Sequence, residues 1–168
     1  MYTKNTQMKI NIDPVATQKI AQLLKREEIA ILIIEDSREL QLHLEKIFTE
    51  AFPNATVYSF EGFGVDEHEL EFLIEKGGYD IVSVDGSLNT WNPHPVFGTR
   101  GTKIVQYIKE VVPKTFVISC SSDPLNNDLS IKRGADMGGR KRGPLQPCRE
   151  GKKYQRTGVT LSFLFLET

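Results

Sequence analysis

Short apolar runs alternate along the chain with stretches that carry an apolar residue every three or four positions. Residues 29–34 form a continuous isoleucine-rich run that predicts a buried strand, and Ser37 can cap a following helix that runs through Phe52. The same order then repeats, with strands predicted over 55–60, 80–84 and 115–119 and helices over 66–76, 102–112 and 124 to about 134. This alternation predicts an α/β fold with a doubly wound, parallel sheet.

The amino-terminal region predicts one further helix before the first strand. Asp13 followed by Pro14 is typical of a helix start, and the stretch continues to about Glu28. Four apolar residues are available for one face of this helix: Val15, Ile20, Leu23 and Leu24.

The carboxyl-terminal region fits the alternation less well. The expected fifth strand reads only MGGR at 137–140, which is a poor strand sequence, and the residues after 142 show no helical periodicity. We therefore expect an extension over 1–28, a regular domain over 29–142, and an atypical basic and apolar tail over 143–168 with an irregular structure. The apolar end of this tail is a candidate surface for self-association into a homo-oligomer.

Composition and charge narrow the function only slightly. The formal net charge is -1 and the pI is about 6.3, so there is no global reason to expect nucleic acid or anionic lipid as a partner. Neither a signal peptide nor a membrane span is visible. The two cysteines, Cys120 and Cys148, match no zinc or redox spacing, and a cytoplasmic location is expected.

Acidic and hydroxyl side chains follow several predicted strands. Glu35 and Asp36 follow the first strand, Asp85 follows the third, and Ser119 ends the fourth, with Ser121 as a substitute if the register shifts. The carboxyl ends of parallel strands meet at one edge of a sheet, so these side chains can converge. Three carboxylates within about 4 to 6 Å repel one another by several kcal/mol. Such a cluster needs a cation, and Mg²⁺ prefers these hard oxygen ligands.

Four sequence segments resemble the response-regulator receiver domains of two-component signalling. They read ILIIEDS at 31–37, YDIVSVDGSL at 79–88, TFVISCSSD at 115–123 and IKRGADMGGRK at 131–141, and their order and spacing are more specific than any one of them. The resemblance covers about residues 29–142. It implies a five-stranded, flavodoxin-like fold and a Mg²⁺-dependent phosphoacceptor aspartate.

The resemblance also implies roles for individual residues. Glu35 and Asp36 become the acidic pair that holds Mg²⁺, and Asp85 becomes both the phosphoacceptor and a metal ligand. Three further residues surround the phosphoryl group: Ser119 through a switch hydroxyl, Cys120 through its backbone N–H, and Lys141 through its charge. The fourth metal ligand implied is the backbone carbonyl of Ser87. Two departures from the family pattern are Arg142 in place of a proline and a long loop that contains Trp91 and His94.

Three functions are compatible with these residues. The leading interpretation is a phosphorelay switch, not an enzyme, that accepts a phosphoryl group from a histidine kinase or phosphotransfer protein and then alters binding to a downstream protein target. The first alternative is a pseudo-receiver that only binds partners. The second is a Mg²⁺-dependent phosphohydrolase, which is less favoured because Ser87 stands where such enzymes place a second aspartate. His94 and Trp91 are interpreted as loop packing, and neither is assigned a role.

Overall fold

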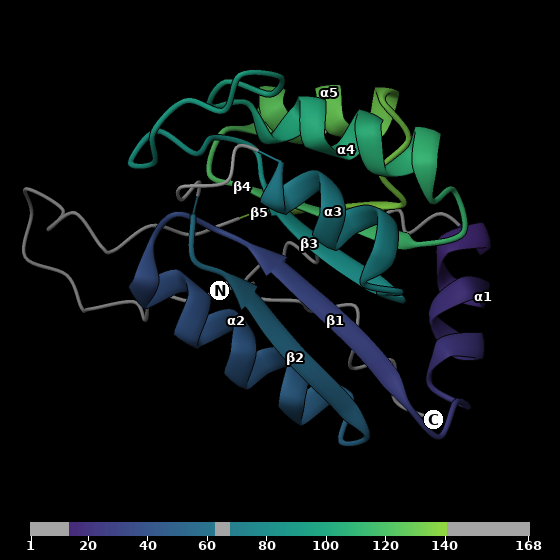
Figure 1. The fold of residues 1–168 in the computed structure, drawn as a ribbon. Helices are drawn as coiled ribbons and strands as arrows, with labels where there is room; N and C mark the ends of the chain where they lie inside the picture. Colours follow the sequence, from purple (N-terminus) through teal and green to yellow (C-terminus); the bar gives the residue numbers. More distant parts are fainter. Residues whose placement is uncertain (1–13, 63–67, 141–168) are drawn as a thin grey trace, which may run out of the picture.

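A single parallel sheet organises the chain. The structure is a computed structural model that describes residues 14–62 and 68–140. The described strands follow the order β2-β1-β3-β4-β5, and every adjacent pair is parallel (Figure 1). This order confirms the predicted doubly wound, flavodoxin-like sheet. The strands are β1 (Ile29–Ile34), β2 (Ala55–Phe60), β3 (Ile81–Asp85), β4 (Phe116–Ser121) and β5 (Met137–Arg140).

Helices cover both faces of the sheet. On one face lie α1 (Pro14–Leu23) and α2 (Arg38–Ala51). On the other lie α3 (Glu69–Lys76), α4 (Gly101–Val111) and α5 (Pro124–Lys132). The predicted cap of α2 is confirmed, because the Ser37 hydroxyl accepts from the Leu40 amide. None of the helices that the structure describes has the length and apolar content of a membrane span.

Two apolar cores hold these layers together. The first packs β1 residues such as Ile31 and Ile33 against Leu44 and Phe48 of α2. The second packs the opposite faces of β1 and β3 against α3 and α4, with Ile104 and Ile108 fully buried. The central strands β1, β3 and β4 are buried along almost their whole length, as expected for parallel strands with helices on both sides.

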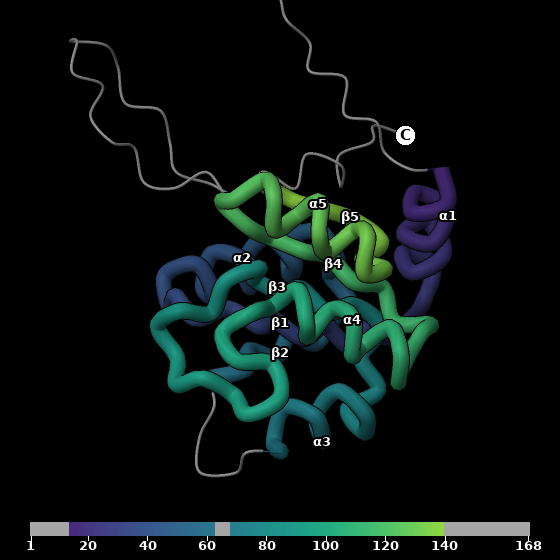
Figure 2. The backbone as a smooth tube through the Cα atoms, turned by 90° about the horizontal axis from the view of Figure 1, so that it is seen from above, coloured from purple at the N-terminus to yellow at the C-terminus, as the bar shows by residue number. Residues whose placement is uncertain are grey.

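The predicted amino-terminal helix is present as α1, on the side of the sheet where β4 and β5 lie (Figure 2). Ala16 and Ile20, one helical turn apart, are buried in the first core and attach α1 to the sheet. The prediction for the buried face was wrong for Val15 and Leu24, which are about half exposed. Val15 is turned away from the face that carries Ala16 and Ile20, whereas Leu24 lies just beyond the last residue of α1, Leu23.

The fifth strand forms in spite of its weak sequence. Met137–Arg140 pairs in parallel with β4, from Ile118 opposite Met137 to Ser121 opposite Arg140. The Asn127 side chain of α5 supports the pair, since its Nδ2 donates to the carbonyls of Ser121 and Gly139 at 3.2 and 3.1 Å. The predictions for Lys141, Arg142 and the irregular tail over 143–168 lie outside the described residues.

Candidate functional site

The structure brings the three predicted acidic residues together. Glu35 and Asp36 follow β1 directly, and Asp85 is the last residue of β3. One carboxylate oxygen from each residue lies within 4.8 Å of the others. Glu35 and Asp85 are 1% and 7% exposed, so two members of this acidic cluster are buried at the carboxyl ends of the strands.

Short backbone turns orient two of these carboxylates. The Ser87 amide donates to Asp85 Oδ1 at 3.2 Å, and the Ser37 amide donates to Glu35 Oε1 at 3.1 Å. In each case the donor lies two residues after the acid, so the chain that leaves the strand folds back on its own side chain. The two carboxylates are thereby directed to the same edge.

The acidic cluster has the chemistry of a divalent-cation site. At an effective dielectric near 20, two unit charges at this separation repel by about 3 kcal/mol. Three hard oxygen donors on a rigid sheet edge suit Mg²⁺, which takes one or two carboxylates and keeps several waters. The donor set therefore fits the cation that the sequence predicts.

Thr90, which the sequence analysis did not identify, binds Asp36 directly. Its backbone amide donates to Asp36 Oδ2 at 2.8 Å. Its hydroxyl lies 2.8 Å from the same oxygen and 3.1 Å from the Asp36 carbonyl. These residues are 54 positions apart, and Thr90 lies in an irregular loop, so no local pattern could have indicated the contact.

A glycine lets helix α4 begin against the backbone of Asp85. A Cβ atom added at Gly101 would lie 1.6 Å from the Asp85 carbonyl oxygen, so no larger residue fits without movement of the backbone. Gly101 thus fixes α4 close to the acidic cluster, at the end of the long loop over residues 86–100.

Two serines of β4 have different surroundings. The Ser119 side chain is fully buried, and its hydroxyl donates to Asn127 Oδ1 at 3.3 Å. The Ser121 hydroxyl lies beside Gly86, the residue that follows Asp85. A Cβ atom added at Gly86 would be 3.0 Å from the Ser121 Oγ. Cys120 lies opposite Asp85 in the pairing of β4 with β3, and its buried thiol accepts from the Ser83 hydroxyl at 3.6 Å.

The imidazole of His94 helps to fold the long loop. Its Nδ1 accepts from the amides of Val96 and Phe97 at 3.1 and 3.4 Å, and its ring stacks on Phe97 with centroids 4.6 Å apart. Its Nε2 lies 3.7 Å from Glu71 Oε2. These contacts agree with a packing role.

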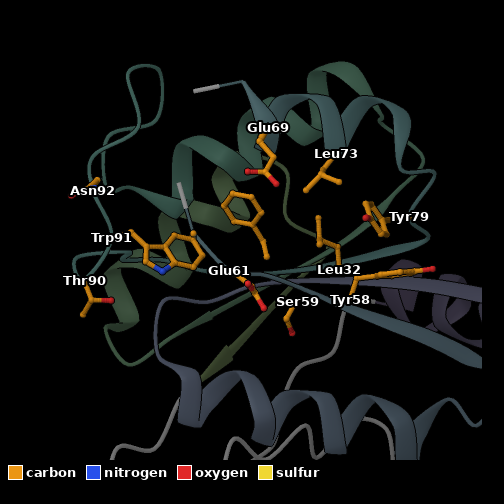
Figure 3. A pocket seen from close by; sticks show the side chains of 12 residues that line it. Leu32, Tyr58, Ser59, Glu61, Glu69, Leu73, Tyr79, Thr90, Trp91 and Asn92 are labelled. Carbon is orange, nitrogen blue, oxygen red and sulfur yellow. The ribbon is translucent and has the colours of Figure 1, made fainter. Parts of the chain in front are cut away.

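Trp91 lies at one end of a groove of about 690 Å³ (Figure 3). The groove is connected to the acidic cluster through Thr90, which lines it and donates to Asp36. Its indole meets Phe60 edge-on, with ring centroids 5.4 Å apart. Thr90 and Asn92 lie at the same end, and Tyr58 and Tyr79 lie at the other. Burial is the main cause that raises the pKa of Tyr79 above its ordinary value, and electrostatic interaction with the neighbouring Tyr58 adds to it.

Comparisons with known proteins reveal the fold but no close relative. No protein-family model matches the chain, and no curated protein matches its sequence. Among solved structures, the isolated receiver domain of RcsB from Salmonella enterica serovar Typhimurium, determined in the presence of phosphomimetic BeF3-, is 19% identical with a TM-score of 0.55. That match covers 69% of this chain and 79% of the RcsB domain.

Two further receiver structures match at a similar level. TrrA from Thermotoga maritima, in complex with Mg²⁺ and BeF, is 19% identical with a TM-score of 0.53, and the match covers 68% of this chain and 87% of TrrA. A response regulator from Burkholderia pseudomallei with a phosphorylated aspartic acid and a calcium ion is 14% identical with a TM-score of 0.51. That match covers 66% of this chain but 58% of the Burkholderia chain. The receiver-domain resemblance is therefore confirmed at the level of the fold.

Proposed function

We propose that this chain is a phosphoacceptor switch of the receiver type, with Asp85 as the phosphorylated residue. The observation that carries the proposal is the acidic cluster of Glu35, Asp36 and Asp85 at the carboxyl edge of a receiver fold. Receiver structures with a phosphorylated aspartate or a beryllium fluoride have the same fold, which supports a phosphoryl-accepting role. The activity of the switch lies in changing a protein surface, so it is not an enzyme in the ordinary sense.

The proposed reaction transfers a phosphoryl group from a phosphohistidine to Asp85. A carboxylate oxygen of Asp85 attacks phosphorus, the P–N bond breaks, and the imidazole leaves and takes up a proton. Mg²⁺, held by Glu35, Asp36, Asp85 and the backbone carbonyl of Ser87, would screen the charge on the incoming phosphoryl group. The product is an acyl phosphate that adds about two negative charges to the site.

Hydroxyl and amide donors then stabilise the phosphorylated state. We assign the hydroxyl to Ser121 in place of Ser119. Both side chains are buried, but Ser121 lies beside Gly86 and its oxygen accepts from the Asp123 amide, which leaves its O–H to donate, whereas the Ser119 O–H already donates to Asn127. The backbone amide of Cys120 stays the proposed second donor, because Cys120 is paired with Asp85 across the ladder. The role of Lys141 stays a prediction, since that residue lies outside the described part of the chain.

The partners follow from this chemistry. A histidine kinase or a phosphotransfer protein would supply the phosphoryl group, and a downstream protein would read the altered surface. A cytoplasmic location suits such partners and the buried thiol of Cys120. Neither nucleic acid nor a membrane is required.

Acetyl phosphate labelling tests the proposal. Wild-type protein incubated with acetyl phosphate and Mg²⁺ should gain one base-labile phosphoryl group, detected by intact-mass spectrometry. Asp85→Asn should abolish this labelling, because an amide does not attack phosphorus, while the fold survives a nearly isosteric change. Asp128→Asn is the matched control, since Asp128 is exposed on α5 and lies outside the acidic cluster.

Two outcomes would contradict the proposal. Unchanged labelling of Asp85→Asn would show that another residue is the acceptor. No labelling of wild-type protein, with Mg²⁺ binding retained, would favour the alternative of a pseudo-receiver that binds partners without phosphorylation.

A further inference from the structure

The long loop over residues 86–100 reaches the acidic cluster through Thr90. This residue places both of its donors on Asp36, the backbone amide on Oδ2 at 2.8 Å and the hydroxyl within 2.8 Å of the same oxygen. Two donors that meet one carboxylate oxygen fix the rotation of the Asp36 side chain. The other oxygen, Oδ1, lies outside these bonds.

Trp91, one peptide bond further on, forms part of the wall of the groove (Figure 3). Its indole packs edge-on against Phe60 and lies so close to Gly62 that a Cβ there would be 2.9 Å from Nε1. A movement of Thr90 together with Asp36 would carry the Trp91 backbone with it, because the two residues are joined through one rigid peptide plane.

Phe60, against which Trp91 packs, is linked by hydrogen bonds to Glu35 of the acidic cluster. The buried Gln41 side chain donates from Nε2 to the carbonyls of Glu35 and Phe60, at 2.7 and 3.0 Å. The Phe60 backbone is thereby held to Glu35, whereas Trp91 moves with the loop over residues 86–100. A movement of Thr90 together with Asp36 would therefore displace Trp91 relative to Phe60.

We propose that Thr90 is a positioning residue that orients Asp36 for the cation and transmits occupation of the acidic cluster to Trp91 and the groove. This inference rests on the proposed function, because it needs the cluster to bind Mg²⁺. It goes beyond that function by assigning the long loop as the element that responds to the site. The surface that changes is the groove lined by Trp91, Tyr58 and Tyr79.

The threonine hydroxyl can be removed with little change of shape. Thr90→Val keeps the branched side chain and the backbone amide but loses the hydroxyl, and Thr90→Ser restores the hydroxyl. Groups that orient a metal ligand typically contribute 10- to 100-fold to metal affinity. Thr90→Val should therefore raise the Kd for Mg²⁺ about tenfold, and Thr90→Ser should bind close to wild type.

A titration of the full chain with MgCl₂ measures both halves of the proposal. Calorimetry gives the Kd, and intrinsic fluorescence reports on Trp91, which is the single tryptophan of the sequence. Wild-type emission should change as Mg²⁺ binds, and the change at saturation should be smaller in Thr90→Val. Thr99→Val, in the same loop, is the matched control and should behave as wild type in both measurements.

The outcomes separate the inference from the proposed function. If wild-type protein binds no Mg²⁺ by calorimetry, the metal site itself is wrong and the inference falls with it. If wild type and Thr90→Val bind with the same Kd, the site stands and Thr90 has no positioning role. If Thr90→Val weakens binding but wild-type fluorescence does not respond to Mg²⁺, Thr90 positions Asp36 without transmitting to Trp91, and the transmission is overturned.

Discussion

Carboxylates at the two opposite ends of the parallel strands have different surroundings. At the carboxyl ends of the strands, one carboxylate oxygen from each of Glu35, Asp36 and Asp85 lies within 4.8 Å of the others, and backbone amides and Thr90 are among the groups that bond them. At the amino edge, just before β5, Asp136 instead lies 2.5 Å from both Lys19 and Lys109. The first arrangement gathers three acids, whereas the second places two lysines on one acid.

This difference separates a site from a structural contact. An acid paired with lysines of its own fold gains stability and leaves little charge for a ligand. Three acids close together cost stability until an external cation arrives. The same substitution, aspartate to asparagine, should therefore change the free energy of unfolding with opposite signs at the two edges.

The largest effect is expected at the amino edge. Asp136→Asn removes the charge that pairs with Lys109, whose side chain is 15% exposed, and leaves that lysine partly buried without its partner. It also weakens the bond that Asp136 Oδ2 accepts from the Val117 amide at 2.9 Å. The free energy of unfolding should fall by about 2–3 kcal/mol, measured by urea denaturation at neutral pH.

The pH dependence checks the cause of this loss. Burial alone would raise the pKa of Asp136, but the hydrogen bonds from Lys109, Lys19 and Val117 lower it below the ordinary 3.8. The stability that Asp136 contributes is therefore present above this value and is lost as the pH falls through the folded-state pKa. The gap between wild type and Asp136→Asn should narrow below about pH 4. A constant gap would point to altered packing instead of charge.

The second effect has the opposite sign. Asp85→Asn removes one charge from the acidic cluster and keeps the oxygen that accepts from the Ser87 amide. Without metal, the free energy of unfolding should rise by about 1 kcal/mol, because repulsion within the cluster decreases.

Added Mg²⁺ should reverse this order. A ligand at about 100 times its Kd stabilises the folded state by about 2.7 kcal/mol, and wild type should gain this while Asp85→Asn gains less. Thermal unfolding with and without MgCl₂ measures both effects. A loss of stability in metal-free Asp85→Asn would mean that the cluster is already neutralised within the chain.

The same contrast explains what the sequence could predict. Strand ends are local features, so the positions of Glu35, Asp36 and Asp85 followed from the apolar runs before them, and the parallel order placed them together. The period of the strands and helices likewise predicted the sheet and most of the helix boundaries. These features depend on neighbours a few residues away.

Contacts between residues far apart in the chain could not be predicted from the sequence. Thr90 and Asp36 meet over 54 positions, and Lys19 meets Asp136 over 117, so neither pair leaves a local pattern. The fifth strand was underestimated because its glycines have low strand propensity, while its support comes from Asn127 of α5. The proposed assignment of the switch hydroxyl to Ser121 likewise uses the register of β4, which a single sequence does not determine.

The smallest effect concerns how α1 is held at the amino edge. Lys19 and Lys109 both lie 2.5 Å from Asp136, but the Lys19 side chain is 47% exposed, so water and salt screen its charge. Lys19→Met should cost only about 0.5 kcal/mol, because exposed pairs contribute little and the methionine keeps most of the aliphatic stem. In about 1 M NaCl even this cost should fade, since the Debye length shrinks to about 3 Å.

Lys46→Met is the matched control, because Lys46 pairs with Glu50 on the surface of α2. If Lys19→Met instead costs as much as Asp136→Asn, then α1 is held by charge and not by the burial of Ala16 and Ile20.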